Sequence, residues 1–163
     1  MSAYQIVPLS QALQHVETVT DWLTNAFGAE NSRAFFASIL RASLSEADFP
    51  LTWVALDGER VAGTVGLWRC DLISRQDLFP WLAALYVDEG YRGEGLSGQL
   101  QQTVIAECRL RGYPTLYLYA ECADYYERFG WRYRGEALDY PDKTVRLYYR
   151  DLEGSPSFPS RDN

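Results

Sequence analysis

The sequence has very little of what metal sites and triad hydrolases need. It contains one histidine, His15, and three cysteines in 163 residues. A Ser-His-Asp triad would have to use His15, and no serine sits in a G-x-S-x-G motif. The grouped His and Cys ligands of a zinc site are missing as well, so we expect no metal. We predict that His15 lies in an N-terminal helix and has a surface or packing role.

Membrane segments and disulfides are also absent from the pattern. No run of roughly 18 apolar residues occurs, and the N-terminus lacks the basic and apolar regions of a secretory signal. The cysteines Cys70, Cys108 and Cys122 are odd in number and widely spaced, which is typical of reduced thiols. We therefore expect a cytoplasmic protein with no membrane partner.

Positive charge is scarce. The formal net charge is −7, and an acidic surface repels phosphate backbones, so we expect no nucleic-acid partner. The same charge mildly favours a cationic substrate such as an amine. The length fits a single domain, which we place at residues 1–151, followed by a disordered tail over 152–163 that is rich in Ser, Pro and charge.

Hydrophobic periodicity predicts an α+β chain. Alternating or continuous apolar runs indicate seven strands, over 4–8, 51–56, 60–68, 81–87, 115–119, 131–137 and 145–150. Apolar residues at helical spacing indicate four helices, over 10–27 with Ser10 as cap, from 31 onward, over 96–111 and over 124–129. Asp57-Gly58 predicts the turn of an antiparallel hairpin.

The most informative segment is Gly93-x-Gly95-x-x-Gly98, which follows a predicted strand and opens a helix. It matches the dinucleotide fingerprint G-x-G-x-x-G, and Glu121 lies roughly where a ribose-binding carboxylate is expected. Glycines let backbone amides approach a phosphate, and the helix start adds partial positive charge, to which Arg92 contributes. A pyrophosphate is therefore the expected occupant.

Three features argue against a dinucleotide fold. Residues 88–92 separate the strand end from the first glycine, whereas the fingerprint needs a tight turn. Only 42 residues follow Glu121, and they predict a short helix and two antiparallel strands rather than further parallel units. A helix pair and a hairpin precede the motif, which leaves it in the middle of the chain.

The chain resembles the GNAT superfamily of N-acetyltransferases. The family's cofactor motif is Gln/Arg-x-x-Gly-x-Gly/Ala, and here it reads Arg92-x-x-Gly95-x-Ser97, with serine as the departure. Residues 82–88 resemble the family's fourth strand, and 125–131, Tyr-Tyr-Glu-Arg-Phe-Gly-Trp, resemble its Y-E-x-x-G-F segment. The resemblance implies a layered α/β/α fold with a mixed, mostly antiparallel sheet of about six to seven strands and about four helices.

The resemblance also implies acetyl-CoA as acetyl donor. It assigns cofactor binding to the end of the fourth strand and the glycine turn: Leu85, Tyr86, Val87, Arg92, Gly93, Glu94, Gly95, Leu96, Ser97 and Gly98. The implied reaction is direct transfer of the acetyl group to a primary amine of a small molecule or protein.

Proton transfers are assigned by the same resemblance and by position. Tyr126 aligns with the family tyrosine near the cofactor sulfur and is the predicted general acid, with Tyr125 as its substitute if the register slips. The glutamate that some members of the family carry on the fifth strand aligns with Tyr119, and Glu121 lies two residues on, on the same face if the strand continues. Glu121 is the predicted base, with Glu89, Asp124 or a water chain as alternatives.

Several alternatives remain open at this level. Cys122 could form an acetyl-enzyme, although no histidine explains its activation. A catalytically silent acyl-CoA-binding sensor is the main rival to an enzyme, and an NAD-binding enzyme is a third option. The acceptor amine, the size of the acyl group and the oligomeric state, for which a homodimer is possible, carry no motif.

Overall fold

The structure, a computed structural model, describes residues 3–29 and 31–152. Within them the strands follow the hydrogen-bonding order β1-β2-β3-β4-β5-β7-β6, with β4 parallel to β5 and antiparallel pairing for β1–β2, β2–β3, β5–β7 and β6–β7. The predicted α+β fold with a mixed, mostly antiparallel sheet is confirmed. The described residues form two compact units, one of residues 3–29, 31–68 and 82–104 and the other of residues 69–81 and 105–152.

The first unit contains three antiparallel strands and the strand that leads to the glycine turn. These are β1 (Gln5–Pro8), β2 (Leu51–Asp57), β3 (Arg60–Trp68) and β4 (Trp81–Val87), whose first residue belongs to the second unit. Asp57 pairs with Arg60 across a two-residue turn, and Gly58 has a φ of 62° there. Glycine adopts this left-handed conformation without steric cost, so the predicted hairpin forms where Asp57-Gly58 placed it.

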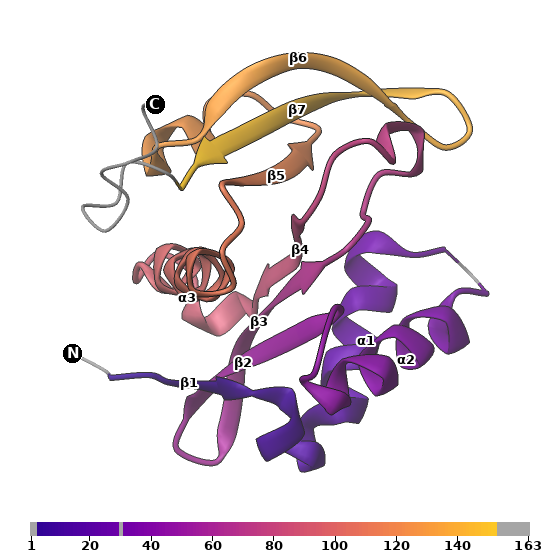
Figure 1. Ribbon diagram of the computed structural model, residues 1–163. Helices are drawn as coiled ribbons and strands as arrows, with labels where there is room; N and C mark the ends of the chain where they lie inside the picture. The colour runs from indigo at the N-terminus through magenta and orange to yellow at the C-terminus, as the bar shows by residue number, and fades with distance from the viewer. Residues whose placement is uncertain (1–2, 30, 153–163) are drawn as a thin grey trace. The chain divides into compact units, whose positions relative to one another are not determined.

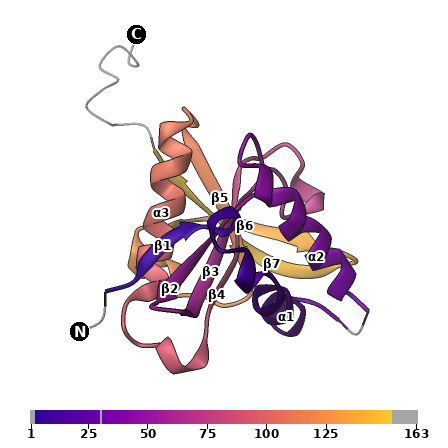
Figure 2. The ribbon, with the colours of Figure 1, turned by 90° about the horizontal axis from the view of Figure 1, so that it is seen from below.

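Helices cover both faces of β2 and β3. On one face α1 (Val16–Phe27) and α2 (Arg33–Ala42) lie side by side (Figure 1) and bury Leu23 and Leu40 against Val54. On the other face Gly63 lies against Leu96 and Leu100 of α3 (Leu96–Leu110). Figure 2 shows α3 on the side of β2 and β3 opposite α1 and α2. The absence of a side chain at Gly63 lets this helix approach the strand closely.

The first helix begins later than predicted. Two 3₁₀ turns, Leu9–Gln11 and Leu13–His15, precede α1, and Ser10 bonds to the Glu46 side chain instead of capping the helix. The prediction of a helix from residue 10 is therefore wrong for its first six positions. His15 is 9% exposed and packs in the second turn, in agreement with its predicted packing role.

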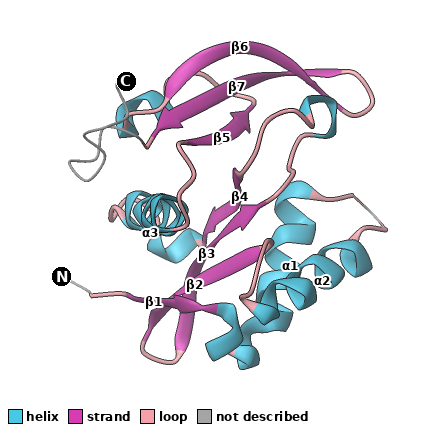
Figure 3. Ribbon diagram, in the orientation of Figure 1, coloured by secondary structure: helices cyan, strands magenta, loops and turns pink. Residues whose placement is uncertain are grey.

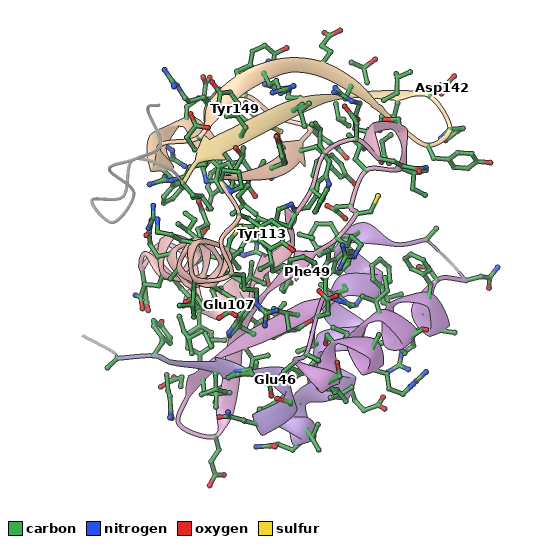
Figure 4. All side chains as sticks on the ribbon, in the orientation of Figure 1. Glu46, Phe49, Glu107, Tyr113, Asp142 and Tyr149 are labelled. Atoms are coloured by element: carbon green, nitrogen blue, oxygen red, sulfur yellow. The ribbon has the colours of Figure 1, made fainter. Side chains whose placement is uncertain are left out.

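The second unit is built on three strands, β5 (Thr115–Ala120), β6 (Arg132–Asp139) and β7 (Lys143–Asp151). β7 pairs with both β5 and β6 (Figure 3), and Asp142 lies in the turn between β6 and β7 (Figure 4). One face of these strands packs against the segment before β4. The buried residues on that side are Leu72, Leu78, Trp81, Ala137, Val145 and Leu147, with Tyr117 and Tyr119 partly buried against them.

Two predictions near the C-terminus change in detail. The short helix predicted over 124–129 is a 3₁₀ turn, Tyr126–Phe129, so the described residues contain three α-helices rather than about four. Leu152, predicted to begin the tail, is buried, and its amide donates to the Pro114 carbonyl at 2.7 Å. The rest of the predicted tail, 153–163, lies outside the described residues.

The three cysteines are free, with Cys108 buried and the other two exposed. Burial raises the pKa of the Cys108 thiol to about 12, so it stays protonated at neutral pH. None of the helices in the described part of the chain is long and apolar enough to cross a bilayer.

The packing of α2 predicts a stability difference between two leucines. Leu40 is 1% exposed in the core of the first unit, whereas Leu13 is 59% exposed. We expect Leu40→Ala to lower the free energy of unfolding by about 2–5 kcal/mol, because it leaves a cavity. Leu13→Ala, the control, should change it by less than about 0.5 kcal/mol. Urea denaturation measures both, and equal effects would contradict the assigned core.

Candidate functional site

β4 contains an unusual backbone conformation three residues before its end. Ala84 has a φ of 54°, although it carries a side chain that disfavours the left-handed region. Such strain costs on the order of 1–3 kcal/mol and clusters where a protein meets a ligand. Leu85, Tyr86 and Val87 follow it and are half-buried. No sequence signal marks Ala84, because alanine is compatible with an ordinary strand.

A fixed turn connects β4 to α3. The Asp88 amide donates to the Ala62 carbonyl at 2.9 Å, and the Tyr91 amide donates to the Asp88 carbonyl at 2.9 Å. The Tyr91 hydroxyl donates to Asp57 at 2.9 Å, which ties the turn to the hairpin of β2 and β3. Five residues, 88–92, thus separate the strand from Gly93. This is the long turn that the sequence predicted, and it differs from the tight turn of a dinucleotide-binding fold.

Gly93 and Gly95 supply the conformations that this turn needs. Their φ angles are 83° and 84°, and a Cβ at either position would have no atom within 4 Å. The next residue, Leu96, is 1% exposed and begins α3. The first amides of a helix have no partner within the helix and carry partial positive charge. The open space and these amides fit a phosphate group.

Arg92 is held at the same turn. Its Nε donates to the Val87 carbonyl at 2.8 Å, and its guanidinium carbon lies 5.4 Å from the centre of the Tyr86 ring. An arginine has five N–H donors, so this bond leaves its Nη groups available to an anion. The side chain therefore fits the phosphate-binding role that the sequence assigned to it.

Ser97 occupies the motif position at which the family usually has glycine or alanine. Its hydroxyl accepts a hydrogen bond from the Gln101 side chain at 3.2 Å, and Gln101 is 1% exposed. Ser97 and Gly98 are half-buried at the start of α3, whereas Glu94 is exposed and accepts a bond from Tyr4. All ten residues predicted to bind the cofactor thus lie on one continuous strand–turn–helix segment of the first unit.

Tyr126 lies in the second unit, in the 3₁₀ turn Tyr126–Phe129, and is half-buried. Its ring centre is 4.9 Å from that of Tyr125, 6.4 Å from that of Trp131 and 6.2 Å from that of Tyr148. Burial, with smaller contributions from Tyr125 and Asp71, raises the pKa of Tyr126 well above its ordinary value. The hydroxyl is therefore protonated at neutral pH, as a tyrosine ordinarily is, and it has no hydrogen-bond partner among the described residues.

Glu121, also in the second unit, is exposed and forms an ion pair with Lys143. Its carboxylate lies 2.6 Å from the Lys143 ammonium, and the two side chains are 64% and 53% exposed. An amine proton could reach Glu121 only after this partner moved. The other residues considered for proton or acyl transfer are also exposed, apart from the half-buried Tyr125: Glu89, Cys122 and Asp124.

Asp71 is a carboxylate that the sequence did not single out. It is half-buried in the segment before β4, and the residues beside it anchor it: Leu72 is fully buried, and Ser74 donates to the Leu138 carbonyl at 2.5 Å. Burial and the nearby negative charge of Asp139 raise the pKa of Asp71 well above its ordinary value. Asp71 forms no ion pair within the described residues. Sequence reasoning missed it because it lies in a segment with no motif.

The chain matches the acetyltransferase (GNAT) domain family over residues 10–134. No curated protein sequence matches it. Among solved structures it resembles an N-acetyltransferase from Staphylococcus aureus Mu50, with 18% identity, a TM-score of 0.70, and 93% of this chain and 100% of that chain covered.

Two further structures share the fold. An aminoglycoside 6′-N-acetyltransferase complexed with coenzyme A has 15% identity and a TM-score of 0.71, covering 93% and 99% of the two chains. An acetyltransferase from Salmonella typhimurium that modifies the N-terminal serine of ribosomal protein L7/L12 has 14% identity and a TM-score of 0.65, covering 93% and 96%. At these identities the likeness concerns the fold alone.

The glycine turn predicts the effect of a single added carboxylate. Gly95→Asp should weaken CoA binding about 100-fold or more, because like charges brought together cost several kcal/mol. Gly112→Asp is a matched control, since Gly112 also has a positive φ, 89°, and open space around it. Isothermal titration with CoA measures both. Equal losses in the two variants would show that backbone strain, not charge at the turn, is responsible.

The raised pKa of Asp71 predicts a stability change with a definite sign. A carboxyl whose pKa is higher in the folded than in the unfolded state costs stability as pH rises between the two values. We expect Asp71→Asn to be more stable than the wild type at pH 7, and the difference to vanish as pH falls toward about 3.9, the ordinary pKa of an aspartate.

Asp77 provides the control of opposite sign. A hydrogen bond from Arg75 is the main cause that lowers the pKa of Asp77. Its contribution favours the folded state above the unfolded pKa, so Asp77→Asn should not stabilise the protein at any pH. Denaturation curves between pH 3 and 8 test both variants, and a destabilised Asp71→Asn at pH 7 would contradict the assigned environment.

Proposed function

Because the chain belongs to the GNAT acetyltransferase family, we propose that it moves the acetyl group of acetyl-CoA to a primary amine by direct transfer in a ternary complex. The observation that carries this proposal is the turn at Gly93 and Gly95, which leads into the start of α3 beside Arg92. The relatives named above act on an aminoglycoside and on a protein N-terminus. The proposed acceptor class therefore includes amines of small molecules and of proteins.

We assign the CoA pyrophosphate to the amides of residues 95–98 and to the Arg92 guanidinium. Positive-φ glycines, open space and a helix start support this assignment. The pantetheine arm is assigned to Leu85, Tyr86 and Val87, which follow the strained Ala84. Acetyl-CoA supplies the activated thioester, and the protein must orient it, supply a proton to the departing thiolate and remove one from the amine.

Tyr126 is the proposed proton donor. A thiol has an ordinary pKa of about 8.5, so its anion leaves more readily when a positioned hydroxyl donates to it. Burial keeps the Tyr126 hydroxyl protonated, and no described residue competes for its hydrogen. A protonated hydroxyl with no competing acceptor supports the assignment made from the sequence.

Glu121 and Asp71 are two candidate proton acceptors, beside the alternatives Glu89, Asp124 and a water chain. An alkylamine has an ordinary pKa of about 10.4 and must lose a proton before it attacks. Glu121 is the residue chosen from the sequence, but Lys143 already pairs with it. Asp71 has no such partner among the described residues, and its raised pKa makes its carboxylate a stronger base. We therefore propose Asp71 as a second candidate beside Glu121.

A catalytically silent acyl-CoA-binding module is the competing function. The pairing of Glu121 with Lys143 favours it, because the residue chosen as base is not free to act. A screen of primary amines with acetyl-CoA, read by thiol release, separates the two. Release with any amine supports the enzyme, whereas tight binding of acetyl-CoA without release for the whole panel supports the silent module.

We also propose a cytoplasmic location and homodimer formation. Free cysteines support the first, because thiols persist in a reducing compartment. The position of β6 at the end of the strand order supports the second, because an edge strand offers unpaired backbone groups to another copy.

The assignment of Tyr126 predicts a selective kinetic effect. Tyr126→Phe should lower kcat by about 100-fold, within the range for loss of a general acid, and leave the Kd for acetyl-CoA nearly unchanged. Tyr125→Phe is the control for its neighbour. Steady-state kinetics and titration measure the two quantities. Full turnover of Tyr126→Phe across the pH range would remove Tyr126 from the mechanism.

A further inference from the structure

We infer that Glu127 is a positioning residue, which acts through Tyr148 and Arg146 to hold the turn that carries Tyr126. The inference rests on the proposed role of Tyr126 as proton donor. Glu127 is the next residue in the same 3₁₀ turn, and all four side chains belong to the second unit.

The three side chains form a short hydrogen-bonded chain. Arg146 Nε donates to the Tyr148 hydroxyl at 2.8 Å, and this hydroxyl donates to Glu127 Oε2 at 2.9 Å. Arginine has only donors and an ionised carboxylate only acceptors, so the direction of the Tyr148 proton is determined: it points to Glu127. Arg146 Nη2 also lies 3.6 Å from Glu127 Oε2, which balances the charge of the carboxylate.

The Glu127 carboxylate contacts Tyr148 and Arg146 of β7. Although its burial opposes ionisation, the nearby backbone of Glu127 and Asp124, the Tyr148 hydroxyl and the charge of Arg146 favour the carboxylate, and the balance lowers its pKa below the ordinary value. Tyr148 donates to Oε2, whereas Oε1 is buried with no hydrogen-bond partner among the described residues. The amide of Gly130, which has a φ of 94°, donates to the Glu127 carbonyl at 3.1 Å and ends the turn. Glu127 is thus bonded through both its main chain and its side chain.

The turn needs this support because it is short. A four-residue 3₁₀ turn has poor hydrogen-bond geometry and cannot fix a side chain by itself. Tyr148 provides two contacts at once: its hydroxyl bonds to Glu127, and its ring centre lies 6.2 Å from that of Tyr126. Tyr148 is fully buried on β7, so it is a rigid reference for the turn.

Arg146 is fixed from the opposite side by β6. Its guanidinium carbon lies 4.1 Å from the centre of the Tyr133 ring, within the range of a cation–π contact. Tyr133 pairs with Tyr148 across the two strands. The contacts therefore run from the sheet through Arg146 and Tyr148 to Glu127, and they transmit the rigidity of β6 and β7 to the turn that carries Tyr126.

Tyr148→Phe tests this inference by removing one hydroxyl while keeping the ring. We expect kcat to fall about 10-fold and the KM for acetyl-CoA to stay within about 2-fold, as for loss of an interaction that acts on the chemical step. Glu127→Gln should act in the same direction. Tyr149→Phe is the matched control, because Tyr149 is the next residue on β7 and successive residues of a strand lie on opposite faces.

A double-mutant cycle distinguishes positioning from a general structural effect. If the hydroxyl of Tyr148 acts through Tyr126, Tyr148→Phe should have no further effect on kcat in a Tyr126→Phe background. An equal loss in both backgrounds would overturn the inference. Thermal unfolding of Tyr148→Phe gives the stability loss, which must leave the variant folded at the assay temperature.

A measurement without turnover keeps the inference separate from the proposed function. With 3-fluorotyrosine incorporated, the ¹⁹F resonance of Tyr126, assigned from Tyr126→Phe, should shift or broaden in Tyr148→Phe and in Glu127→Gln, and stay unchanged in Tyr149→Phe. Should the wild type transfer no acetyl group, the proposed function fails while this spectrum still decides the positioning role. An unchanged Tyr126 resonance in both network variants would refute it.

Discussion

The start of α3 is the constraint on which the candidate cofactor site depends. A pyrophosphate can be bound by backbone amides only if no side chain lies between them and the anion. Gly93 and Gly95 meet this condition because their positive φ angles are available to glycine without strain. Buried Leu96 then fixes the helix against β3, where Gly63 allows a close approach. The helix start is consequently held in place by Leu96, while the space beside Gly93 and Gly95 stays open to a ligand.

The second unit places the Tyr126 hydroxyl among aromatic rings and next to a hydrogen-bonded chain of polar side chains. Aromatic rings around Tyr126 exclude water and raise its pKa, while the Arg146–Tyr148–Glu127 chain holds the turn through charge-assisted bonds. Glu127 Oε2 accepts the Tyr148 hydroxyl, whereas Glu127 Oε1 is buried without a partner among the described residues, and an unsatisfied buried oxygen costs stability. This destabilising group lies next to Tyr126, the proposed proton donor, whose reaction requires a fixed geometry.

Sequence reasoning succeeded where a local pattern has one physical meaning. Apolar patterns located all seven strands. β5 alternates as the pleat requires, whereas β2 and β3 are buried along most of their length and appear as continuous apolar runs. The same reasoning failed at residues 10–15, where apolar residues at helical spacing form 3₁₀ turns and Ser10 bonds to Glu46 instead of capping a helix. Ala84 gave no warning of its positive φ, because that conformation is imposed by its surroundings.

The sequence by itself determined the family and pointed to the candidate cofactor segment, since glycine spacing and a helix start are local properties that do not depend on distant contacts. Only the tertiary structure decided the state of the titratable groups. Lys143, which pairs with Glu121, lies on β7, 22 residues further along the chain. Asp71 lies in a segment with no motif, and its pKa is affected by the distant Asp139. Burial, ion pairing and pKa depend on neighbours far along the chain, and no spacing within the sequence reveals which neighbours those are.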